Sequence, residues 1–178
     1  MTPRERREAD ELYLKVSAEF GGALERLARG YEADADRRRD LLQEIHVALW
    51  RSLDRFDGRC SLRTWVYQVA HNTATSKVLR PRRRGPTLVG LDQIASEPRT
   101  PPDQETALDE HRTLERLLAL VRQLKPLDRQ VILLYLEGED AASTGEVTGL
   151  SAGAVAIKVH RIKLLLARQF HRGVSNGR

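Results

Sequence analysis

The chain has 178 residues, of which 40% are hydrophobic and 31% are charged, and its formal net charge is +5. This composition suits one medium or two small globular domains, and the basic balance favours a polyanionic partner, either nucleic acid or an acidic membrane surface. An aromatic content of 5% argues against a β-sandwich or barrel, and the single cysteine, Cys60, excludes an intramolecular disulfide and a thiolate zinc cluster. The N-terminal segment lacks an apolar signal core, and no apolar run reaches the roughly eighteen residues of a membrane span. We therefore expect a soluble, cytoplasmic protein without a membrane span.

Charge divides the chain into three parts. Residues 1–84 carry 18 Lys and Arg against 13 Asp and Glu, residues 85–110 carry 1 against 6, and residues 111–178 carry 11 against 6. Proline removes a backbone donor and biases the preceding residue away from helix. The acidic middle part contains four prolines: Pro86, Pro98, Pro101 and Pro102. The sequence therefore predicts two basic domains, 1–84 and 111–178, joined by a flexible acidic linker over 85–110.

Helical periodicity runs through the first domain. One helix is predicted over 12–29, with an interruption at Gly21-Gly22 left open, and a second over 40–53. The second helix carries the apolar stripe Leu41, Leu42, Ile45, Ala48 and Leu49. Asp57-Gly58 then breaks the chain, and Ser61 can cap a third helix. Its predicted core stripe is Leu62, Trp65, Val66, Val69, Ala70 and Thr73.

The second domain is also predicted to be helical. It opens with the stripe Leu114, Leu117, Leu118, Val121 and Leu124, and Pro126 then begins a helix that runs to about Leu136 and ends at Gly138. A short helix, a tight turn at Gly149 and a long helix capped by Ser151 follow, which is the pattern of a helix-turn-helix at about 141–160. The expected fold is all-α, with two small helical domains and the helix-turn-helix in the second.

Two surfaces suggest contact with nucleic acid. The long last helix carries Lys158, His160, Arg161 and Lys163, which favour docking in a DNA groove over the alternative, the solvated face of a three-helix bundle. The third helix is expected to expose a face with aromatic, amide and hydroxyl groups: Thr64, Tyr67, Gln68, His71, Asn72 and Thr75. Such groups can stack on unpaired bases, at about 1–3 kcal/mol per base, and hydrogen-bond to them. The residues alone leave base contact and an ordinary surface equally open.

Catalytic patterns are weak throughout the sequence. The histidines His46, His71, His111, His160 and His171 are scattered, with no pair at metal-ligand spacing. No glycine-rich phosphate loop, nucleophile elbow or acid pair stands out, and Cys60 is a lone thiol. We expect no metal, no cofactor and no enzymatic activity.

The stretch DLLQEIHVALWRSLDRFDGRCSLRTWVYQVAHNTA resembles region two of bacterial RNA polymerase sigma factors of the extracytoplasmic-function (ECF) group. The stretch LKPLDRQVILLYLEGEDAASTGEVTGLSAGAVAIKVHRIKLLL resembles their region four. The two lie in the order of the family, with a linker of the expected character between them. The resemblance implies a sigma factor that binds core RNA polymerase and directs it to specific promoters.

The resemblance also implies roles for individual residues. Contact with the β′ clamp helices falls to Asp40, Leu41, Gln43, Glu44, Val47 and Trp50. Single-stranded DNA of the −10 element would meet Arg59, Ser61, Arg63, Tyr67, Gln68, His71, Asn72, Lys77, Arg80, Arg82 and Arg83. Duplex DNA of the −35 element would meet Ser151, Ala152, Ala154, Lys158, His160, Arg161 and Lys163. The other face of the second domain would contact the β flap, and members of the family are often held by an anti-sigma factor or another regulator.

Three departures from the family pattern stand out. Arg37, Arg38 and Arg39 stand where acidic residues are common, so we hypothesise that they weaken polymerase docking and that their charge reversal strengthens it. Thr144 and Gly145 make a poor first helix of the helix-turn-helix, since glycine costs roughly 1 kcal/mol there. Ala156 and Ile157 stand where basic and polar residues are frequent, which predicts −35 readout that is either looser or shifted to Lys158, Arg161 and Lys163.

Three other functions compete with the sigma factor. A helix-turn-helix regulator that never joins the polymerase would leave DLLQEIHVALW unexplained. An enzyme acting on nucleic acid would need an acid or metal cluster that the sequence does not suggest. A protein that sequesters polymerase without initiating transcription is consistent with the three departures.

Overall fold

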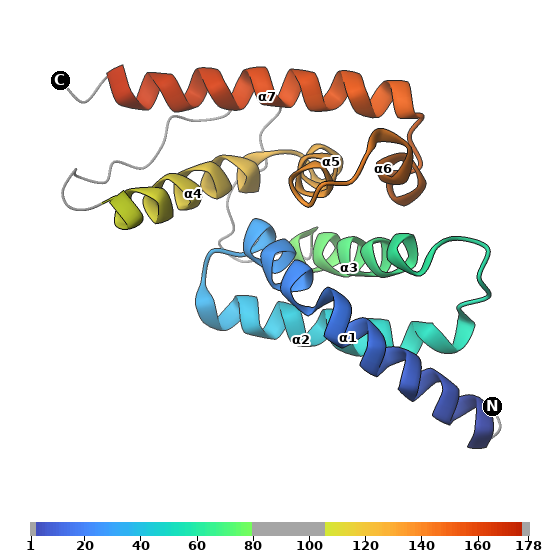
Figure 1. Cartoon of the computed structure of the whole chain (residues 1–178). Coiled ribbons are helices and arrows are strands. Elements are labelled where there is room, and N and C mark those ends of the chain that lie inside the picture. Colours follow the sequence, from blue (N-terminus) through green and yellow to red (C-terminus); the bar gives the residue numbers. More distant parts are fainter. Residues whose placement is uncertain (1–2, 80–105, 176–178) are drawn as a thin grey trace.

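The computed structural model describes residues 3–79 and 106–175, which form α-helices and one short 3₁₀ turn (Figure 1). No strand occurs in these two ranges, so the predicted all-α class is confirmed. Most of the predicted linker, together with Arg80, Arg82 and Arg83, lies outside the described residues.

The first domain is built from α1 (Pro3–Tyr31), α2 (Ala35–Ser52), the 3₁₀ turn η1 (Leu53–Arg55) and α3 (Leu62–Leu79). The helix predicted over 12–29 is confirmed, and α1 continues through Gly21 and Gly22 without a break. Its buried stripe continues on both sides of the two glycines, with Val16 and Phe20 before them and Leu24, Leu27 and Ala28 after them. Tertiary burial of this stripe outweighs the low helix propensity of two glycines.

Short polar caps begin the next two helices. The Asp34 carboxylate accepts a hydrogen bond from the Arg37 backbone N–H at 3.0 Å and starts α2, which buries Leu41 and other residues of its predicted stripe. Gly58, with φ of +74°, breaks the chain as expected. The Ser61 hydroxyl then accepts from the Thr64 backbone N–H at 3.0 Å at the start of α3, which confirms the predicted cap.

The second domain contains α4 (Thr106–Gln123), α5 (Pro126–Leu136), α6 (Ala141–Thr148) and α7 (Ala152–Ser175). Helix α4 begins inside the 85–110 range that was predicted as linker, since the proline-rich composition ends before Thr106. Gly149 adopts φ of +76° between α6 and α7, and the Ser151 hydroxyl accepts from the Ala154 N–H at 3.2 Å. The predicted helix-turn-helix is confirmed.

Gly145 is required by the packing of the helix-turn-helix. A Cβ added there would lie 2.6 Å from the backbone oxygen of Leu150, which begins the turn into α7. The neighbouring Thr144 is buried in the same place. Gly145 keeps the low helix propensity that the sequence predicts for α6, but the close approach of the turn needs a residue without a side chain there.

The two domains pack directly on each other. In Figure 1, α5 and α6 lie over α1 and α3, and buried apolar residues of both domains form one continuous core. Helices α1 and α5 approach closely at Gly30, where an added Cβ would lie 2.5 Å from the Leu133 side chain of α5. The Arg122 guanidinium of α4 donates to the Arg29 carbonyl of α1 at 2.8 Å.

Candidate functional site

A groove of about 520 Å³ runs between α2 and α3. Its lining includes Asp40, Gln43, Glu44 and Val47, four of the six residues predicted to bind polymerase. Trp50 follows Val47 by about one helical turn and is 48% exposed, with its indole Nε1 donating to the Asp10 carboxylate at 2.9 Å. This groove combines acidic, amide and apolar groups on one open face.

Leu41 does not belong to that face. It is only 1% exposed and packs in the core of the first domain with Ile45 and Leu49, one and two turns further along α2. The assignment of Leu41 to polymerase contact is corrected, because the same side chain belongs to the apolar stripe that holds α2 in place.

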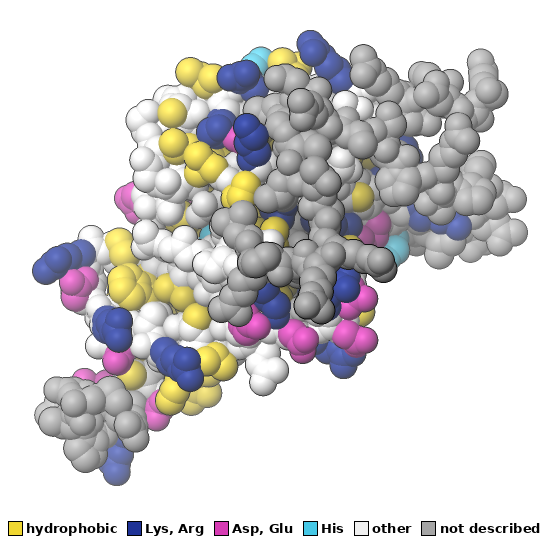
Figure 2. Space-filling model, turned by 180° about the vertical axis from the view of Figure 1, so that it is seen from behind, with side chains coloured by type: hydrophobic (Ala, Val, Ile, Leu, Met, Phe, Trp, Pro, Cys, Tyr) yellow, Lys and Arg dark blue, Asp and Glu magenta, His cyan; other side chains and the backbone are white. Residues whose placement is uncertain are grey.

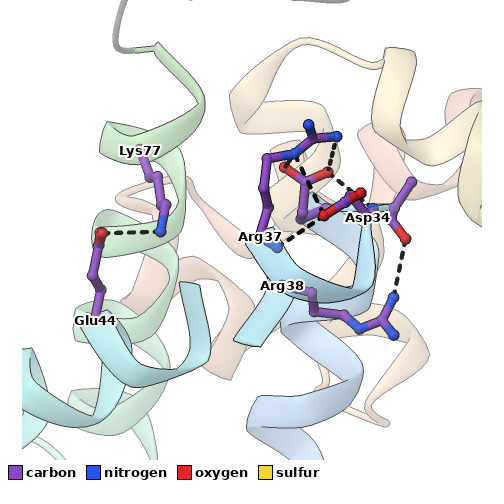
Figure 3. Close-up of polar contacts among 7 residues, drawn as sticks. Asp34, Arg37, Arg38, Glu44 and Lys77 are labelled. Carbon is purple, nitrogen blue, oxygen red and sulfur yellow. Dashed lines mark hydrogen bonds and ion pairs between the residues drawn. The ribbon is translucent and has the colours of Figure 1, made fainter. Parts of the chain in front are cut away.

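An ion pair joins the groove to the neighbouring helix. The Lys77 ammonium of α3 donates to the Glu44 carboxylate of α2 at 2.9 Å (Figure 3). Lys77 was predicted to contact the −10 strand and Glu44 to contact polymerase. The structure therefore links one side chain from each predicted surface across the α2–α3 packing.

The three consecutive arginines are engaged at the start of α2. Arg37 pairs with the buried Glu32 carboxylate at 3.2 Å, and Arg38 donates to the Ala33 carbonyl at 3.2 Å (Figure 3). Arg39 pairs with Asp36. The hydrogen bond to Glu32 raises the pKa of Arg37 above its ordinary value. Arg37 and Arg38 thus fix the junction of α1 and α2.

The expected exposed face of α3 is largely buried. Tyr67 is 1% exposed and makes an edge-to-face contact with Phe20, while the Arg63 guanidinium lies 5.5 Å from the centre of its ring. Thr64 is also buried. The prediction that these side chains are exposed is wrong because α3 packs on both sides, against α1 and α2 and against α6.

His71 is buried on the same helix. Its Nδ1 lies 2.9 Å from the Tyr31 hydroxyl of α1, and its side chain is 1% exposed. Burial lowers the pKa of His71 to about 3, so its imidazole is neutral at pH 7. The prediction of an exposed, base-reading His71 is wrong for this arrangement of the chain.

Other residues of the predicted −10 surface remain accessible. Arg59, Ser61 and Asn72 are exposed and Gln68 is half-buried. The Arg59 guanidinium pairs with Asp57 at 3.0 Å within the loop before α3. An accessible polar strip therefore runs from this loop along one side of α3.

Acidic side chains of the second domain meet α1 and α3. The Glu137 carboxylate accepts two hydrogen bonds from the Arg26 guanidinium, at 2.8 and 2.7 Å. Glu139 pairs with Arg63, and Glu146 accepts from the Thr64 hydroxyl at 2.9 Å. We did not predict this set from the sequence. One feature of the sequence could have indicated it: the basic second domain has few carboxylates, and several of them lie close together within residues 137–146.

The first half of α7 presents a mixed surface. Of the predicted −35 residues, Ser151, Ala152, His160, Arg161 and Lys163 are exposed and Ala154 is half-buried. The Lys158 ammonium is bound to the buried Asp128 carboxylate of α5 at 2.6 Å. Ile157 is 63% exposed, beside the exposed Ala156. This helix therefore offers small and apolar groups next to a few cations.

The remaining surface carries no single dominant basic patch in the view of Figure 2, where Lys and Arg side chains of the described part lie in several separate places. Within residues 3–79 and 106–175, no group of three His, Cys, Asp or Glu side chains is arranged to hold a metal ion. None of the helices in these ranges is long and apolar enough to cross a bilayer.

Each of the two domains matches a family of known proteins. The family model for Sigma-70 region 2 matches residues 18–84, and that for Sigma-70, region 4, matches residues 114–166. The chain is 28% identical over 147 residues to the ECF RNA polymerase sigma factor SigG of Mycobacterium tuberculosis; the match covers 70% of this chain but only 39% of SigG. It is 29% identical over 165 residues to the RNA polymerase sigma factor CnrH of Cupriavidus metallidurans, covering 86% of this chain and 83% of CnrH.

A solved structure shares the fold. The structure of CnrH in complex with the cytosolic domain of CnrY has a TM-score of 0.65 to this chain at 20% identity, covering 94% of this chain and 96% of that one. The two sigma regions occur in the family order, one in each of the two packed helical domains, and the second contains the observed helix-turn-helix. The chain belongs to the ECF group of RNA polymerase sigma factors.

Proposed function

We propose that the protein binds core RNA polymerase and directs it to specific promoters for transcription initiation in the cytoplasm. One observation carries this proposal: a region-two domain with an open α2 groove and a region-four domain with a helix-turn-helix are present in one chain. The protein would supply recognition, and the polymerase would supply the chemistry.

The α2 groove is the proposed docking site for the β′ clamp helices. Val47 and Trp50 provide exposed apolar anchors, and Asp40, Gln43 and Glu44 provide polar groups around them. Interfaces gain most of their affinity from such central apolar anchors, while surrounding charges set orientation and the rate of encounter. Contact with the β flap is proposed for the second domain.

The loop before α3 and the accessible strip of α3 are the proposed reader of the −10 element. Arg59, Ser61, Gln68 and Asn72 can donate to phosphates and to the hydrogen-bonding edges of unpaired bases. The aromatic ring of Tyr67 joins this reader only after the second domain has moved away, since the side chain is now buried.

Helix α7 is the proposed reader of the duplex −35 element in the major groove. Arg161 can donate to guanine or to phosphate, and the exposed Ala156 and Ile157 can contact thymine methyl groups. Lys158 contributes to positioning only if it leaves Asp128, which supports Arg161 and Lys163 as the accessible cations, with Lys163 also donating to the Tyr135 hydroxyl, and His160 as an exposed hydrogen-bonding group.

A protein regulator is a further proposed partner. CnrH, which shares the fold, was solved with the cytosolic domain of a second protein, CnrY. A partner of this kind, an anti-sigma factor, would bind the free chain and withhold it from polymerase.

Binding to purified core polymerase tests the docking part of this proposal. We expect the full-length protein to co-elute with bacterial core enzyme, and the Trp50→Ala variant to bind at least tenfold more weakly because it removes an exposed anchor. The Ile157→Ala variant removes an exposed apolar side chain from α7 and should keep wild-type docking. A wild-type chain that binds duplex DNA but not core enzyme would favour the helix-turn-helix regulator that never joins polymerase.

A further inference from the structure

Helix α7 carries many cations and no acidic residue of its own. Its 24 residues, Ala152–Ser175, include five Lys or Arg and no Asp or Glu. A helix of this charge is attracted to the phosphates of any duplex, because the electrostatic part of binding does not depend on the bases. Carboxylates that neighbouring helices bring to α7 therefore decide how much of this attraction is expressed.

Helix α5 brings one such carboxylate to α7. Asp128, in the first turn of α5, is buried and accepts a hydrogen bond from the Lys158 ammonium at 2.6 Å. The Lys158 side chain is 29% exposed, and Arg161, three residues further along α7, is exposed. Residues three apart lie on the same side of a helix. Lys158 and Arg161 therefore share one side of α7, and the first of them is held by a buried carboxylate.

Lys163 is held at the other end of α5 in a different way. Its ammonium donates to the Tyr135 hydroxyl at 3.2 Å and lies 5.1 Å from the centre of the same ring. A neutral phenol cancels no charge, so Lys163 remains a net cation. Lys158 and Asp128 together carry no net charge, so this pair contributes little to the attraction between α7 and DNA.

Moving Lys158 onto a phosphate would be costly. The Asp128 carboxylate would stay buried without its cation, and removing one partner from a buried ion pair is strongly unfavourable. The gain from the new phosphate contact would be largely offset by this loss, which a contact made by Arg161 does not incur. The salt dependence of DNA binding should therefore include Arg161 but not Lys158.

We propose that Asp128 sets the affinity of α7 for DNA by holding Lys158 away from the phosphate backbone. This inference rests on the proposed function of α7 as a reader of duplex DNA, and it assigns a role in that reading to a residue of the neighbouring helix α5. Loss of the Asp128 charge releases Lys158, which then adds one phosphate contact. Because backbone contacts carry no sequence information, the added affinity does not require a promoter sequence.

The test removes the charge of Asp128 and keeps its shape. In Asp128→Asn, the side-chain oxygen can still accept a hydrogen bond but no longer holds the Lys158 ammonium by charge. The double variant Asp128→Asn/Lys158→Gln has the net charge of the wild type and replaces the ion pair by an amide hydrogen bond. Glu110→Gln, at an exposed position on α4, loses the same charge as Asp128→Asn and is the matched control. Arg161→Gln removes a cation that we expect to contact DNA.

The first measurement is the salt dependence of DNA binding. Circular dichroism and thermal unfolding first establish that each full-length variant is folded. Fluorescence anisotropy then gives its affinity for a short labelled duplex of random sequence between about 50 and 200 mM salt, where each phosphate contact contributes about 0.9 to the slope of log affinity against log salt.

We expect the Asp128→Asn slope to be steeper than that of the wild type by about 0.9, with several-fold tighter binding at low salt. The double variant should return to the wild-type slope, which shows that the change passes through Lys158. Glu110→Gln should keep the wild-type slope, and Arg161→Gln should lose about 0.9 from it.

The second measurement needs no DNA. Limited acetylation followed by mass spectrometry reports how available each lysine is in the folded protein. Lys158 should react more slowly than Lys163 in the wild type, and several-fold faster in Asp128→Asn than in the wild type. Glu110→Gln should leave the rate at Lys158 unchanged. A Lys158 that reacts as fast in the wild type as in Asp128→Asn would overturn the inference.

The outcomes separate the inference from the proposed function. If Arg161→Gln loses slope but Asp128→Asn keeps the wild-type slope, the role of Asp128 is overturned and α7 remains the reader of duplex DNA. A double variant as steep as Asp128→Asn would also overturn it, because Lys158 would then not carry the effect. Equal slopes for the wild type and Arg161→Gln would contradict the proposed reading by α7 and overturn the inference with it.

Discussion

Lys77 of α3 and Glu44 of α2 form an ion pair with 2.9 Å between the ammonium nitrogen and the carboxylate oxygen. The Glu44 side chain is 45% exposed, so the pair is open to solvent on the groove side. Ion pairs of this exposure contribute about 0–1 kcal/mol to stability. Glu44 is thus available to an incoming partner at little cost to the fold.

Replacing Glu44 should separate docking from stability. We expect Glu44→Ala to lower the free energy of unfolding by less than about 1 kcal/mol and to weaken binding to core polymerase about tenfold. Chemical denaturation and a titration of labelled protein with core enzyme measure the two quantities. An equally large loss of docking in Lys77→Ala, which leaves the Glu44 carboxylate in place, would show that the ion pair rather than the carboxylate matters.

His71 should make the fold sensitive to mild acid. Burial lowers its pKa from an ordinary 6.5 to about 3, so the unfolded chain binds a proton that the folded chain does not. Its contribution to stability is complete above about pH 6.5 and declines as the pH falls toward 3, by about 1.4 kcal/mol per pH unit.

The pH dependence can be assigned by substitution. Thermal or urea unfolding between pH 7 and pH 5 should show a clear loss of stability in the wild type and a shallower loss in His71→Leu, although that variant starts from lower stability because the Tyr31 hydroxyl loses its hydrogen bond to the imidazole. His111→Leu, at an exposed position on α4, is the control and should retain the wild-type slope. Equal slopes in all three proteins would contradict the assignment.

Gly145 should be more important for stability than its place in a helix suggests. Gly145→Ala brings a Cβ within 2.6 Å of the Leu150 backbone oxygen, and forcing the turn outward should cost about 1–3 kcal/mol despite the better helix propensity of alanine. Gly153→Ala on α7 meets nothing within 4 Å and should stabilise the protein by up to about 1 kcal/mol. Denaturant unfolding of the two variants measures both stability changes. A Gly145→Ala variant that is more stable than the wild type would refute the packing argument.

The three arginines should differ in their effects. Arg37→Ala removes the guanidinium next to the buried Glu32 carboxylate and should lower the stability, whereas Arg39→Ala should leave it almost unchanged because both partners of its ion pair are exposed. Arg39→Glu therefore tests the docking hypothesis without disturbing the fold. If positive charge weakens docking, core polymerase should bind this variant more tightly; unchanged affinity would discard the idea.

Most of the helical architecture follows from local patterns in the sequence. The stripe of α2, the caps at Ser61 and Ser151 and the positive-φ turns at Gly58 and Gly149 each depend on neighbouring residues, and all were predicted. The helix over 12–29 was also predicted, but its continuity at Gly21-Gly22 was left open, because the burial that sustains it there comes from distant helices.

The site was harder to predict for the same reason. The open residues of the α2 groove share one helical face and could be recognised together, whereas the burial of Tyr67 and His71 depends on both sides of α3 being covered. No periodicity within α3 reveals a second packing partner more than sixty residues away, such as Glu146 against Thr64. The close approach that makes Gly145 necessary is likewise visible only once the turn to α7 has formed.

Transcription in vitro tests the central claim most directly. Purified protein would be mixed with bacterial core polymerase and fragmented genomic DNA of its host, and the 5′ ends of the transcripts would be mapped against a reaction without the protein. The account predicts new starts that share sequence motifs near −10 and −35, and their loss in the Trp50→Ala variant. An absence of new starts, in a reaction where core polymerase also fails to bind the protein, would contradict it.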